Sequence, residues 1–327
     1  MDPGIPERII KHGNCWRWHN EEENLLKGPL LTRSGYGEQA RFALRSLRSR
    51  EDLFDIFIQP LNWGKTSWIS ENNEERRWID RTVHKTIAHI QSGAQYDISL
   101  QVTIPNEWER LAPVNIGYTA GIETNRIAPQ WAEKTNMMDR VIVVSEHSKA
   151  GFKDTVHHGV ATKTGQPMTL QVSPDKEIET VNYPVKKYKK LPKLDLELTT
   201  KFNFLCVAQF GPRKNLENTL KWFLEEFSDD EDVGLVLKTN IARNSLIDRN
   251  RLFRDLHATI HSNFPNRKCK VYLLHGDMTD QEIHALYKHP NIGAFVLLTH
   301  GEGFGLPLFE AAYSGLPVVT VGWSGQL

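Results

Sequence analysis

The stretch from Thr299 to Ala312 reads Thr-His-Gly-Glu-Gly-Phe-Gly-Leu-Pro-Leu-Phe-Glu-Ala-Ala, and it decides the fold. The apolar run Ala294–Leu298 before it is typical of a buried strand, and Leu306–Ser314 after it is predicted to be a helix. Pro307 then falls near the helix start, where proline is tolerated. Glycines let a ligand approach the backbone, and the N–H groups and dipole of a helix N-terminus favour an anion. The stretch therefore predicts a phosphate-binding strand–loop–helix unit.

Two carboxylates, Glu302 in the loop and Glu310 about one turn inside the helix, stand eight residues apart in this stretch. Carboxylates accept hydrogen bonds from hydroxyl groups, so one is suited to a bound sugar and the other to a ribose. A tight turn without a ligand is the simplest alternative, but it gives no reason for two acids at this spacing. A dinucleotide-binding G-x-G-x-x-G fits poorly, because Leu306 stands in the place of its third glycine. Gly64-Lys65-Thr66 suggests a P-loop, but Gln59 replaces the required upstream glycine.

Outward from this stretch, short apolar runs alternate with helix-length amphipathic segments, which predicts parallel sheets covered by helices on both faces. In the first half we predict strands at Asn24–Leu31, Leu53–Gln59, Ile98–Ile104, Val114–Thr119 and Val141–Val144, and helices at Gly37–Arg48, Glu74–Ser92 and Ser145–Asp154. In the second half we predict strands at Phe202–Ala208, Val233–Lys238, Lys270–Leu274, Ala294–Leu298 and Pro317–Val321, and helices at Asn215–Phe227, Asp248–Asn263, Thr279–Tyr287 and Leu306–Ser314.

The 327 residues suggest two domains at roughly 100–200 residues each. We place an N-terminal domain at 1–185, a linker at 186–200 and a C-terminal domain at 201–327, and we expect an irregular or hairpin insertion at Gly159–Glu179. The linker region carries Lys186, Lys187, Lys189, Lys190 and Lys193. Such a cluster is usually a solvated linker, although phosphate or an anionic lipid surface is a second interpretation.

Composition excludes several classes of protein. Lys+Arg and Asp+Glu are both 40, which argues against a general nucleic-acid binder. Cys15, Cys206 and Cys269 are far apart and odd in number, which indicates neither a disulfide framework nor a zinc site. No apolar run is long enough to span a membrane, and the stretch from Met1 to Arg8 lacks the apolar core of a signal peptide. We therefore expect a soluble cytoplasmic protein without a metal site.

The spacing of Glu302 and Glu310 resembles the E-x7-E signature of the large family of retaining glycosyltransferases that includes sucrose synthases and bacterial mannosyl- and glucosyltransferases. Gly303-Phe304-Gly305-Leu306-Pro307 and Ser314-Gly315-Leu316-Pro317-Val318-Val319 match the family pattern as well. The resemblance is strong over Phe202–Leu327 and weaker over the first half. It implies a GT-B fold, in which two Rossmann-like α/β domains face each other across a cleft.

A second match begins at Phe204 and ends in Gly211-Pro212-Arg213-Lys214-Asn215. Arg213 and Lys214 can neutralise the charge that grows on a departing diphosphate, and the resemblance gives a basic pair at this place that role. The simpler alternative is a basic turn after a strand. Ala208 departs from the family, which often has glycine there, and Gly211 is then the residue expected to supply the flexibility.

Further candidates follow other strands. The resemblance places the nucleotide base against His275-Gly276-Asp277, and Lys238 ends a strand that should face the same cleft. In the first half, the loop Ser34-Gly35-Tyr36-Gly37 resembles the family's glycine-rich loop, which faces the donor phosphates and the acceptor. Glu123 follows another strand, where it could contact the acceptor or act as a base, because loops at the carboxyl ends of parallel strands bind ligands.

The resemblance implies transfer of a hexosyl group from a nucleotide diphosphate sugar to a glycan or other acceptor, with retention of configuration, no cofactor and no metal. Glu310 is expected to bind ribose, and Glu302 with Gly303, Phe304, Gly305 and Leu306 the sugar and phosphate. Gly276 and Lys238 complete the donor side. A GT-B sugar-nucleotide epimerase and a non-catalytic nucleotide-sugar or glycan-binding module are the alternatives. The chain ends soon after Pro317–Val321, so we expect an incomplete C-terminal domain.

Overall fold

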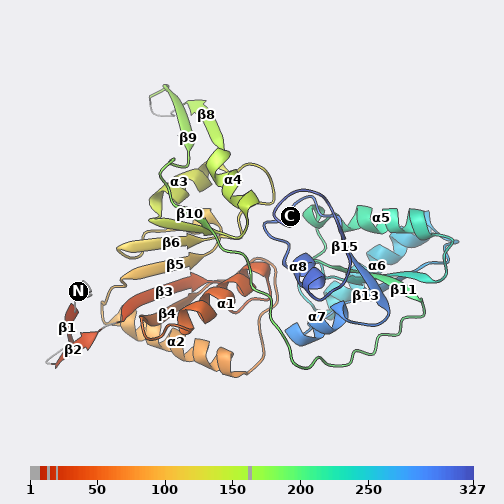
Figure 1. The fold of residues 1–327 in the computed structure, drawn as a ribbon, viewed down its shortest axis with the longest axis horizontal. Helices are drawn as coiled ribbons and strands as arrows, with labels where there is room; N and C mark the ends of the chain where they lie inside the picture. The colour runs from red at the N-terminus through yellow and green to blue at the C-terminus, as the bar shows by residue number, and fades with distance from the viewer. Residues whose placement is uncertain (1–7, 13–14, 20, 161–163) are drawn as a thin grey trace.

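The computed structural model describes residues 8–12, 15–19, 21–160 and 164–327. Two β-sheets, each made of parallel strands and flanked by helices, lie side by side (Figure 1). The chain crosses once from the first sheet to the second. This is the pair of α/β domains that the alternation of strand and helix predicts. Residues 1–7, which make up most of the stretch analysed for a signal peptide, lie outside the described residues, as does the side chain of Cys15.

The N-terminal sheet has six parallel strands in the order β10-β7-β6-β5-β3-β4. They are β3 (Glu22–Gly28), β4 (Phe54–Pro60), β5 (Ile98–Val102), β6 (Val114–Tyr118), β7 (Arg140–Val143) and β10 (Ile178–Thr180). Its helices are α1 (Gly35–Arg48), α2 (Glu74–Gln91), α3 (Pro129–Met137) and α4 (Glu146–Asp154), with a 3-10 turn at Pro105–Glu107.

The C-terminal sheet has five parallel strands in the order β13-β12-β11-β14-β15. They are β11 (Phe202–Val207), β12 (Val233–Lys238), β13 (Lys270–Leu274), β14 (Ile292–Leu297) and β15 (Val318–Thr320). Its helices are α5 (Leu216–Phe227), α6 (Leu246–Asn263), α7 (Asp280–Tyr287) and α8 (Leu306–Tyr313), with a 3-10 turn at Pro212–Lys214.

Strand order determines where each sheet can bind a ligand. In the C-terminal sheet the order reverses between β11 and β14, and in the N-terminal sheet between β3 and β5. Crevices for ligands form outside the carboxyl ends of the strands at such points. The loops after the strands of both sheets meet there: Ser145 after β7 donates to Gly303 after β14, and Arg33 after β3 donates to Met278 after β13. The two crevices therefore face each other.

Each domain is held by apolar faces that the sequence spacing builds. On α1, Ala40, Leu44 and Leu47 are buried, and they pack with Leu26 and Ile58 of the sheet. Fully burying one leucine side chain stabilises a folded protein by about 1.5–3 kcal/mol. Truncation of Leu44 would therefore lower the free energy of unfolding by at least about that amount. The C-terminal core is built in the same way from both faces of its sheet.

The predicted elements agree with the structure to within a few residues, with some differences. The strand predicted at Asn24–Leu31 ends earlier, at Gly28, because the backbone turns at Pro29, where Leu30 N donates to Gly28 O and Thr32 N to Pro29 O. The insertion predicted at Gly159–Glu179 contains the antiparallel hairpin of β8 (Val156–Val160) and β9 (Pro167–Gln171), whose residues 161–163 are not described. The sequence did not predict α3, β10, or the N-terminal hairpin β1 (Arg8–His12) and β2 (Cys15–His19).

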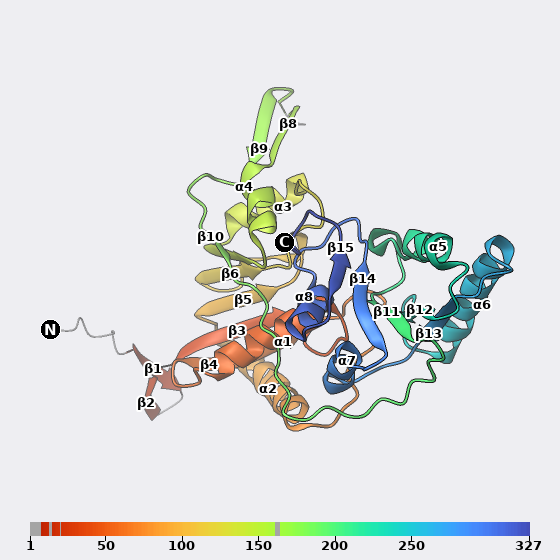
Figure 2. The same cartoon turned by 45° about the vertical axis from the view of Figure 1, so that its right-hand side comes forward.

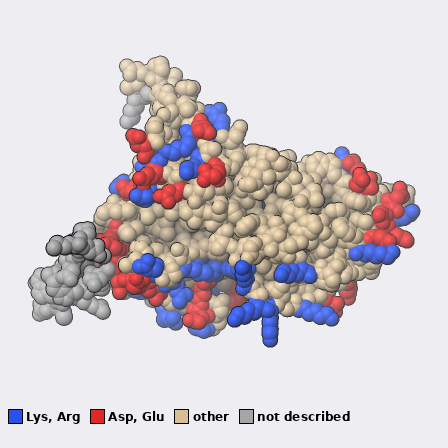
Figure 3. Space-filling model, viewed as in Figure 1, with Lys and Arg blue, Asp and Glu red and all other residues tan. Residues whose placement is uncertain are grey.

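The linker has no helix or strand, but it is not simply solvated. Between Thr180 and Phe202 it passes between the domains and then along the outside of the C-terminal one (Figure 2). Leu194, Leu196 and Leu198 pack against the C-terminal core. Lys and Arg side chains gather along this edge of the molecule (Figure 3). None of the helices among the described residues is long and apolar enough to cross a membrane.

Candidate functional site

A cleft of 640 Å³ opens between the two domains. The first turn of α1 and the first turn of α8 lie on opposite walls, and both point an N-terminus into the cleft region. Its charged and polar lining includes Arg33, Ser34, Glu38, Arg41, Arg45 and Glu75 from the N-terminal domain, Lys186 and Tyr188 from the linker, and Thr279, Asp280, His284, Tyr287 and Glu310 from the C-terminal domain. Two helix N-termini facing one cavity favour an anionic ligand.

The strand–loop–helix unit has the predicted form. β14 ends at Leu297, Gly305 takes the left-handed conformation with φ 79° as N-cap of α8, and Pro307 lies in the first turn. Loop and helix are held to the chain end by Ser324, whose hydroxyl donates to Glu302 O at 2.7 Å and accepts from Glu302 N at 2.8 Å. Ser324 itself has φ 84°. The loop is therefore fixed on both sides of Glu302.

Glu302 lies in a tight charged cluster with the basic pair. Lys214 Nζ is 2.5 Å from Glu302 Oε1, and Arg213 Nη1 is 3.2 Å from Glu302 Oε2. Arg213 also donates to Gly301 O at 2.9 Å. Burial lowers the pKa of Lys214, although the neighbouring carboxylate of Glu302 opposes that change. Glu302, Arg213 and Lys214, the three residues for which we predict a catalytic role, therefore lie together, and a carboxylate oxygen of Glu123 is 3.6 Å from Arg213 Nη2.

In the turn before α5, the residue with left-handed backbone is Asn215 and not Gly211. Gly211 has φ −175° with open space around it, so its conformation does not require glycine. Asn215 instead has φ 54°, and its side chain donates to Leu298 O at 2.9 Å, which joins the end of β14 to the start of α5. The expected flexibility of Gly211 is therefore not what shapes this turn.

Two glycines of the E-x7-E loop touch the N-terminal domain so closely that no side chain fits. A Cβ atom at Gly301 would lie 1.8 Å from Glu123 O, and one at Gly303 would lie 2.1 Å from Ala120 O. Ser145 Oγ donates to Gly303 O at 2.6 Å. These glycines therefore also serve the contact between the domains.

Glu310 lines the cleft on α8 and differs from Glu302 in its surroundings. No cation lies beside it within ion-pair distance among the described residues, and Tyr287 OH donates to Glu310 Oε2 at 3.3 Å. Burial raises the pKa of Glu310 to about 7, and the negative charges of Glu38 and Asp280 act in the same direction. A hydrogen-bond acceptor with these surroundings suits neutral hydroxyl donors.

The glycine-rich loop of the first domain forms the N-terminus of α1 and is held there by a cap and by close packing. Ser34 caps α1 by accepting from Gly37 N at 2.9 Å, and a Cβ at Gly37 would lie 2.1 Å from Thr32 O. Tyr36 OH lies 2.7 Å from Thr119 Oγ1, and burial raises the pKa of Tyr36. Ser34 and Gly35 line the cleft, whereas Tyr36 turns toward β6.

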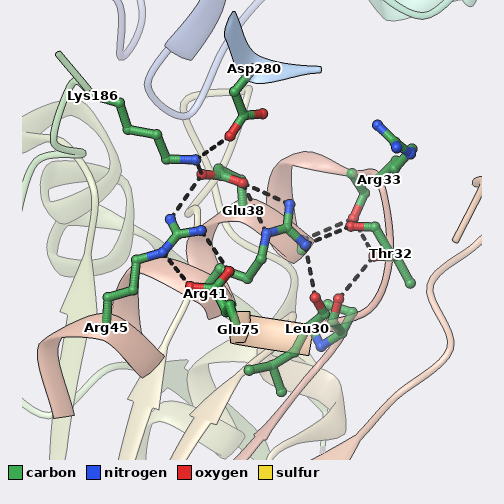
Figure 4. Close-up of polar contacts among 12 residues, drawn as sticks. Leu30, Thr32, Arg33, Glu38, Arg41, Arg45, Glu75, Lys186 and Asp280 are labelled. Carbon is green, nitrogen blue, oxygen red and sulfur yellow. Dashed lines mark hydrogen bonds and ion pairs between the residues drawn. The ribbon is translucent and has the colours of Figure 1, made fainter. Parts of the chain in front are cut away.

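Arg41 binds the backbone that leads into this loop (Figure 4). Its guanidinium donates to Leu30 O at 2.8 Å and Thr32 O at 2.9 Å, and to Glu38 Oε2 through both Nε and Nη2. Burial alone would raise the pKa of Glu38, but the positive charges of Arg41, Lys186 and Arg45 lower it to about 2. Glu38 is therefore a permanent anion at the base of the loop.

Lys238 and Gly276 lie together at the ends of β12 and β13. Lys238 Nζ donates to Gly276 O at 2.6 Å, and burial lowers the pKa of Lys238. Gly276 has φ 121°, which a side chain would strain. The Thr279–Glu282 capping box follows directly and starts α7.

Most of the candidate residues thus form three groups. Ser34, Gly35, Leu306 and Glu310 line the cleft. Glu302, Arg213, Lys214 and Glu123 form the charged cluster, which is not among the cleft-lining residues, and Lys238 with Gly276 forms the third group. Sequence reasoning missed Arg33, Glu38 and Asp280, and it treated Lys186 as one of several solvated lysines. The sequence offered one signal for these residues, an acid at Glu38 in the first helical turn after the glycine-rich loop. An acid there is also common because it interacts favourably with the helix dipole, so it does not by itself indicate a site.

The Gly64-Lys65-Thr66 segment does not form a P-loop. It lies in the loop between β4 and α2, and Thr66 Oγ1 donates to Trp63 O at 2.7 Å rather than starting a helix. Among the described residues, no group of three His, Cys, Asp or Glu side chains is arranged to hold a metal ion.

The C-terminal part of the chain is similar to a known protein family. Residues 189–326 match the model of Glycosyl transferases group 1. Two proteins of Escherichia coli, both named serotype-specific mannosyltransferase WbdA, are 30% identical over 119 residues, which cover 36% of this chain and 13% and 12% of those proteins. The match thus spans about an eighth of the length of these relatives.

Solved structures extend the likeness to both domains. The lipopolysaccharide outer core galactosyltransferase WaaB superposes with a TM-score of 0.54 at 12% identity, covering 91% of this chain and 80% of its own. A UDP-forming trehalose-phosphate synthase from Burkholderia xenovorans gives 0.56 at 11% identity, covering 93% and 85%. Sucrose-phosphate synthase from Thermosynechococcus elongatus gives 0.56 at 14% identity, covering 93% and 82%. At these identities the likeness shows the fold, which is GT-B as the sequence predicts. The likeness to the glycosyl transferases group 1 family is thus carried by residues 189–326, and the likeness of fold extends to both domains.

Proposed function

We propose that this protein transfers a hexosyl group from a nucleotide diphosphate sugar to a hydroxyl group of an acceptor, with retention of configuration and without a metal ion. The observation that carries the proposal is the pair of acids on the α8 unit, which lies inside the family-matched segment and opposite the glycine-rich loop of the other domain. Glu310 faces the cleft and Glu302 lies beside two cations.

We assign the donor to the C-terminal side. Glu310 accepts hydrogen bonds from the ribose hydroxyls, the N-terminus of α8 meets the diphosphate, and Gly276 and Lys238 adjoin the base. Glu302 and the backbone of Phe304–Leu306 contact the sugar. Arg213 and Lys214 exchange part of their contact with Glu302 for the phosphate oxygens, which stabilises the negative charge of the leaving group. The acceptor lies against the N-terminal domain, with Glu123 and the Ser34–Gly37 loop beside it.

The reaction joins the acceptor oxygen to the anomeric carbon while the bond from that carbon to the diphosphate oxygen breaks. The electron pair of the broken bond leaves with the nucleoside diphosphate, and the acceptor proton passes to a phosphate oxygen on the same face of the sugar. This route needs no pair of catalytic carboxylates of the hydrolase kind. Close contact of the two domains keeps water away from the activated sugar.

The test is calorimetric titration of the chain with UDP, GDP and ADP and with their hexose conjugates, mannosyl donors first because the two E. coli relatives are named mannosyltransferases. A Glu310→Ala, Arg213→Ala double variant serves as comparison. Saturable binding of one nucleotide class that is lost in the double variant supports the donor site, and product formation with an acceptor panel supports transfer.

Other outcomes decide between the alternatives. Binding without turnover on any acceptor would assign a nucleotide-sugar-binding module. Release of a free sugar or of an altered sugar nucleotide without an acceptor would assign an epimerase. A folded chain that binds none of the nucleotides contradicts the proposal.

A further inference from the structure

Lys186 of the linker makes an ion pair with each domain at the same time (Figure 4). Its Nζ lies 2.5 Å from Glu38 Oε1 on α1 and 2.5 Å from Asp280 Oδ2 at the start of α7. The Lys186 side chain is 24% exposed and Glu38 is 16% exposed, so this contact is partly shielded from water, whereas Asp280 is 59% exposed. All three residues line the cleft.

On the N-terminal side, Lys186 acts on the glycine-rich loop. Glu38 binds Arg41, and Arg41 holds the carbonyl oxygens of Leu30 and Thr32 just before the Ser34 cap. Arg45 also reaches Glu38 at 3.3 Å and binds Glu75 through two hydrogen bonds. The anion that Lys186 contacts is therefore part of a network that fixes one wall of the cleft.

On the C-terminal side, Lys186 acts on the turn between β13 and α7. Asp280 follows the Thr279 cap in this turn. Arg33 of the N-terminal domain holds the same turn from another direction, since it donates to Met278 O at 3.2 Å and lies 3.6 Å from Asp277 Oδ1. Residues 277–280 are thus tied to the first domain directly and through the linker.

We propose that Lys186 is a positioning residue that clamps the two walls of the cleft at the separation that the donor needs. This inference rests on the proposed function for its effect on donor binding, whereas the clamp itself does not. Because one ammonium group contacts both carboxylates, the walls cannot separate without the loss of at least one ion pair. Glu310 shares the cleft with this bridge, so the clamp sets the distance from the α1 loop to the ribose-binding acid.

The first test replaces Lys186 by methionine, which keeps the length of the side chain and removes its charge. We expect donor binding to weaken about three- to tenfold, because a larger share of the free protein is open and must close on binding. The Michaelis constant for the donor should rise by the same factor with kcat little changed. Lys190→Met is the matched control, since Lys190 is an exposed lysine of the same linker, and it should change neither constant.

A second readout follows the domains without any substrate. Trypsin cleaves after the linker lysines 186, 187, 189, 190 and 193, and Lys186→Met and Lys190→Met each remove one of these sites, so the two variants keep equal numbers of them. We expect faster cleavage into two domain-sized fragments and a larger radius of gyration in X-ray scattering for Lys186→Met, and unchanged values for Lys190→Met. If the wild-type chain binds no nucleotide, the proposed function fails while these two measurements still test the clamp.

Charge exchange separates a clamp from a general effect on folding. Lys186→Glu brings three carboxylates together and should open the cleft further. Adding Asp280→Lys places a cation between Glu38 and the new acid at 186, and it should restore protease resistance and donor affinity to within about twofold of wild type. Lack of rescue in a variant that unfolds at the wild-type temperature, or wild-type compactness in Lys186→Met, would overturn the inference.

Discussion

Lys214 Nζ contacts Glu302 Oε1 at 2.5 Å, so the cation and the first acid of the E-x7-E motif neutralise each other in this structure. Their side chains are 16% and 8% exposed. A pair this buried is costly to break on one side only, because the remaining charge stays in a poor solvent. Under the proposed function, in which Lys214 also binds the donor phosphate, stability and donor binding are linked at this contact.

Lys214→Met should lower the free energy of unfolding by about 3 kcal/mol, because Glu302 keeps only Arg213 as a close cation. Chemical denaturation measures this. Adding Glu302→Gln should recover most of the stability but not nucleotide binding, since the phosphate-binding cation is still missing. Lys221→Met, which removes one partner of an exposed helical pair with Glu225, is the control and should change stability by less than about 0.5 kcal/mol.

Glu310 should make stability depend on pH around neutrality. Its folded-state pKa of about 7 lies above the ordinary value of 4.5, so the folded chain binds the extra proton. This contribution is fully present below pH 4.5 and is lost as the pH rises through 7. Glu310→Gln should therefore be more stable than wild type at pH 8, by up to about 3 kcal/mol, and equal to it at pH 4. Equal stabilities at pH 8 would contradict the burial of this carboxyl group.

Nucleotide binding should show the opposite dependence on pH at the same residue. An ionised Glu310 accepts ribose hydroxyl hydrogen bonds better than a protonated one, so affinity should rise between pH 6 and 8. Titration calorimetry across that range measures the rise. Glu310→Gln should bind weakly with a flat profile over this interval, and a wild-type slope retained in the variant would assign the effect to another group.

Gly303→Ala should push the two domains apart. The added Cβ would meet Ala120 O at 2.1 Å, a backbone atom that cannot rotate away. We expect a loss of about 2 kcal/mol in stability, which is the middle of the range for overpacked sites, together with faster protease cleavage between the domains. Gly211→Ala is the control, because that glycine has extended backbone and open space around it.

Arg41→Lys should loosen the glycine-rich loop while keeping its charge. A lysine cannot reproduce the planar set of donors that reach Glu38, Leu30 O and Thr32 O together. We expect about 2 kcal/mol less stability and weaker donor binding. Arg50→Lys alters an exposed pair with Asp52 and should leave both unchanged.

The sequence predicted the fold because its determinants are local. Strand-length apolar runs, the Ser34 and Thr279 caps and the glycine turn before Pro307 each act within a few residues. The short strand β10 was not predicted because three residues carry no periodic pattern. Helix α3 was not predicted because it starts at Pro129 without a side-chain cap.

In the candidate site, too, the residues of local motifs could be predicted, and those that the fold brings together could not. Glu302 and Glu310 share one motif, and the resemblance supplied Arg213 and Lys214. The bridge joins Lys186 to Asp280, 94 positions away, and to Glu38, which is still farther away in the sequence, and no local rule exists for such contacts. A lysine in a basic linker resembles its solvated neighbours until the fold brings two carboxylates to it.

The order of strands in the two sheets also bears on how the chain was assembled. In the second sheet the third strand in chain order, β13, lies next to the second, β12. In the first sheet the third strand, β5, lies next to the first, β3, on the side away from the second, β4. A tandem copy of one ancestral domain would have repeated the same winding. The halves therefore cannot be superposed strand for strand in chain order. A chimera that exchanges the third strand–helix unit of one half for that of the other would place the third strand on the wrong side of the first.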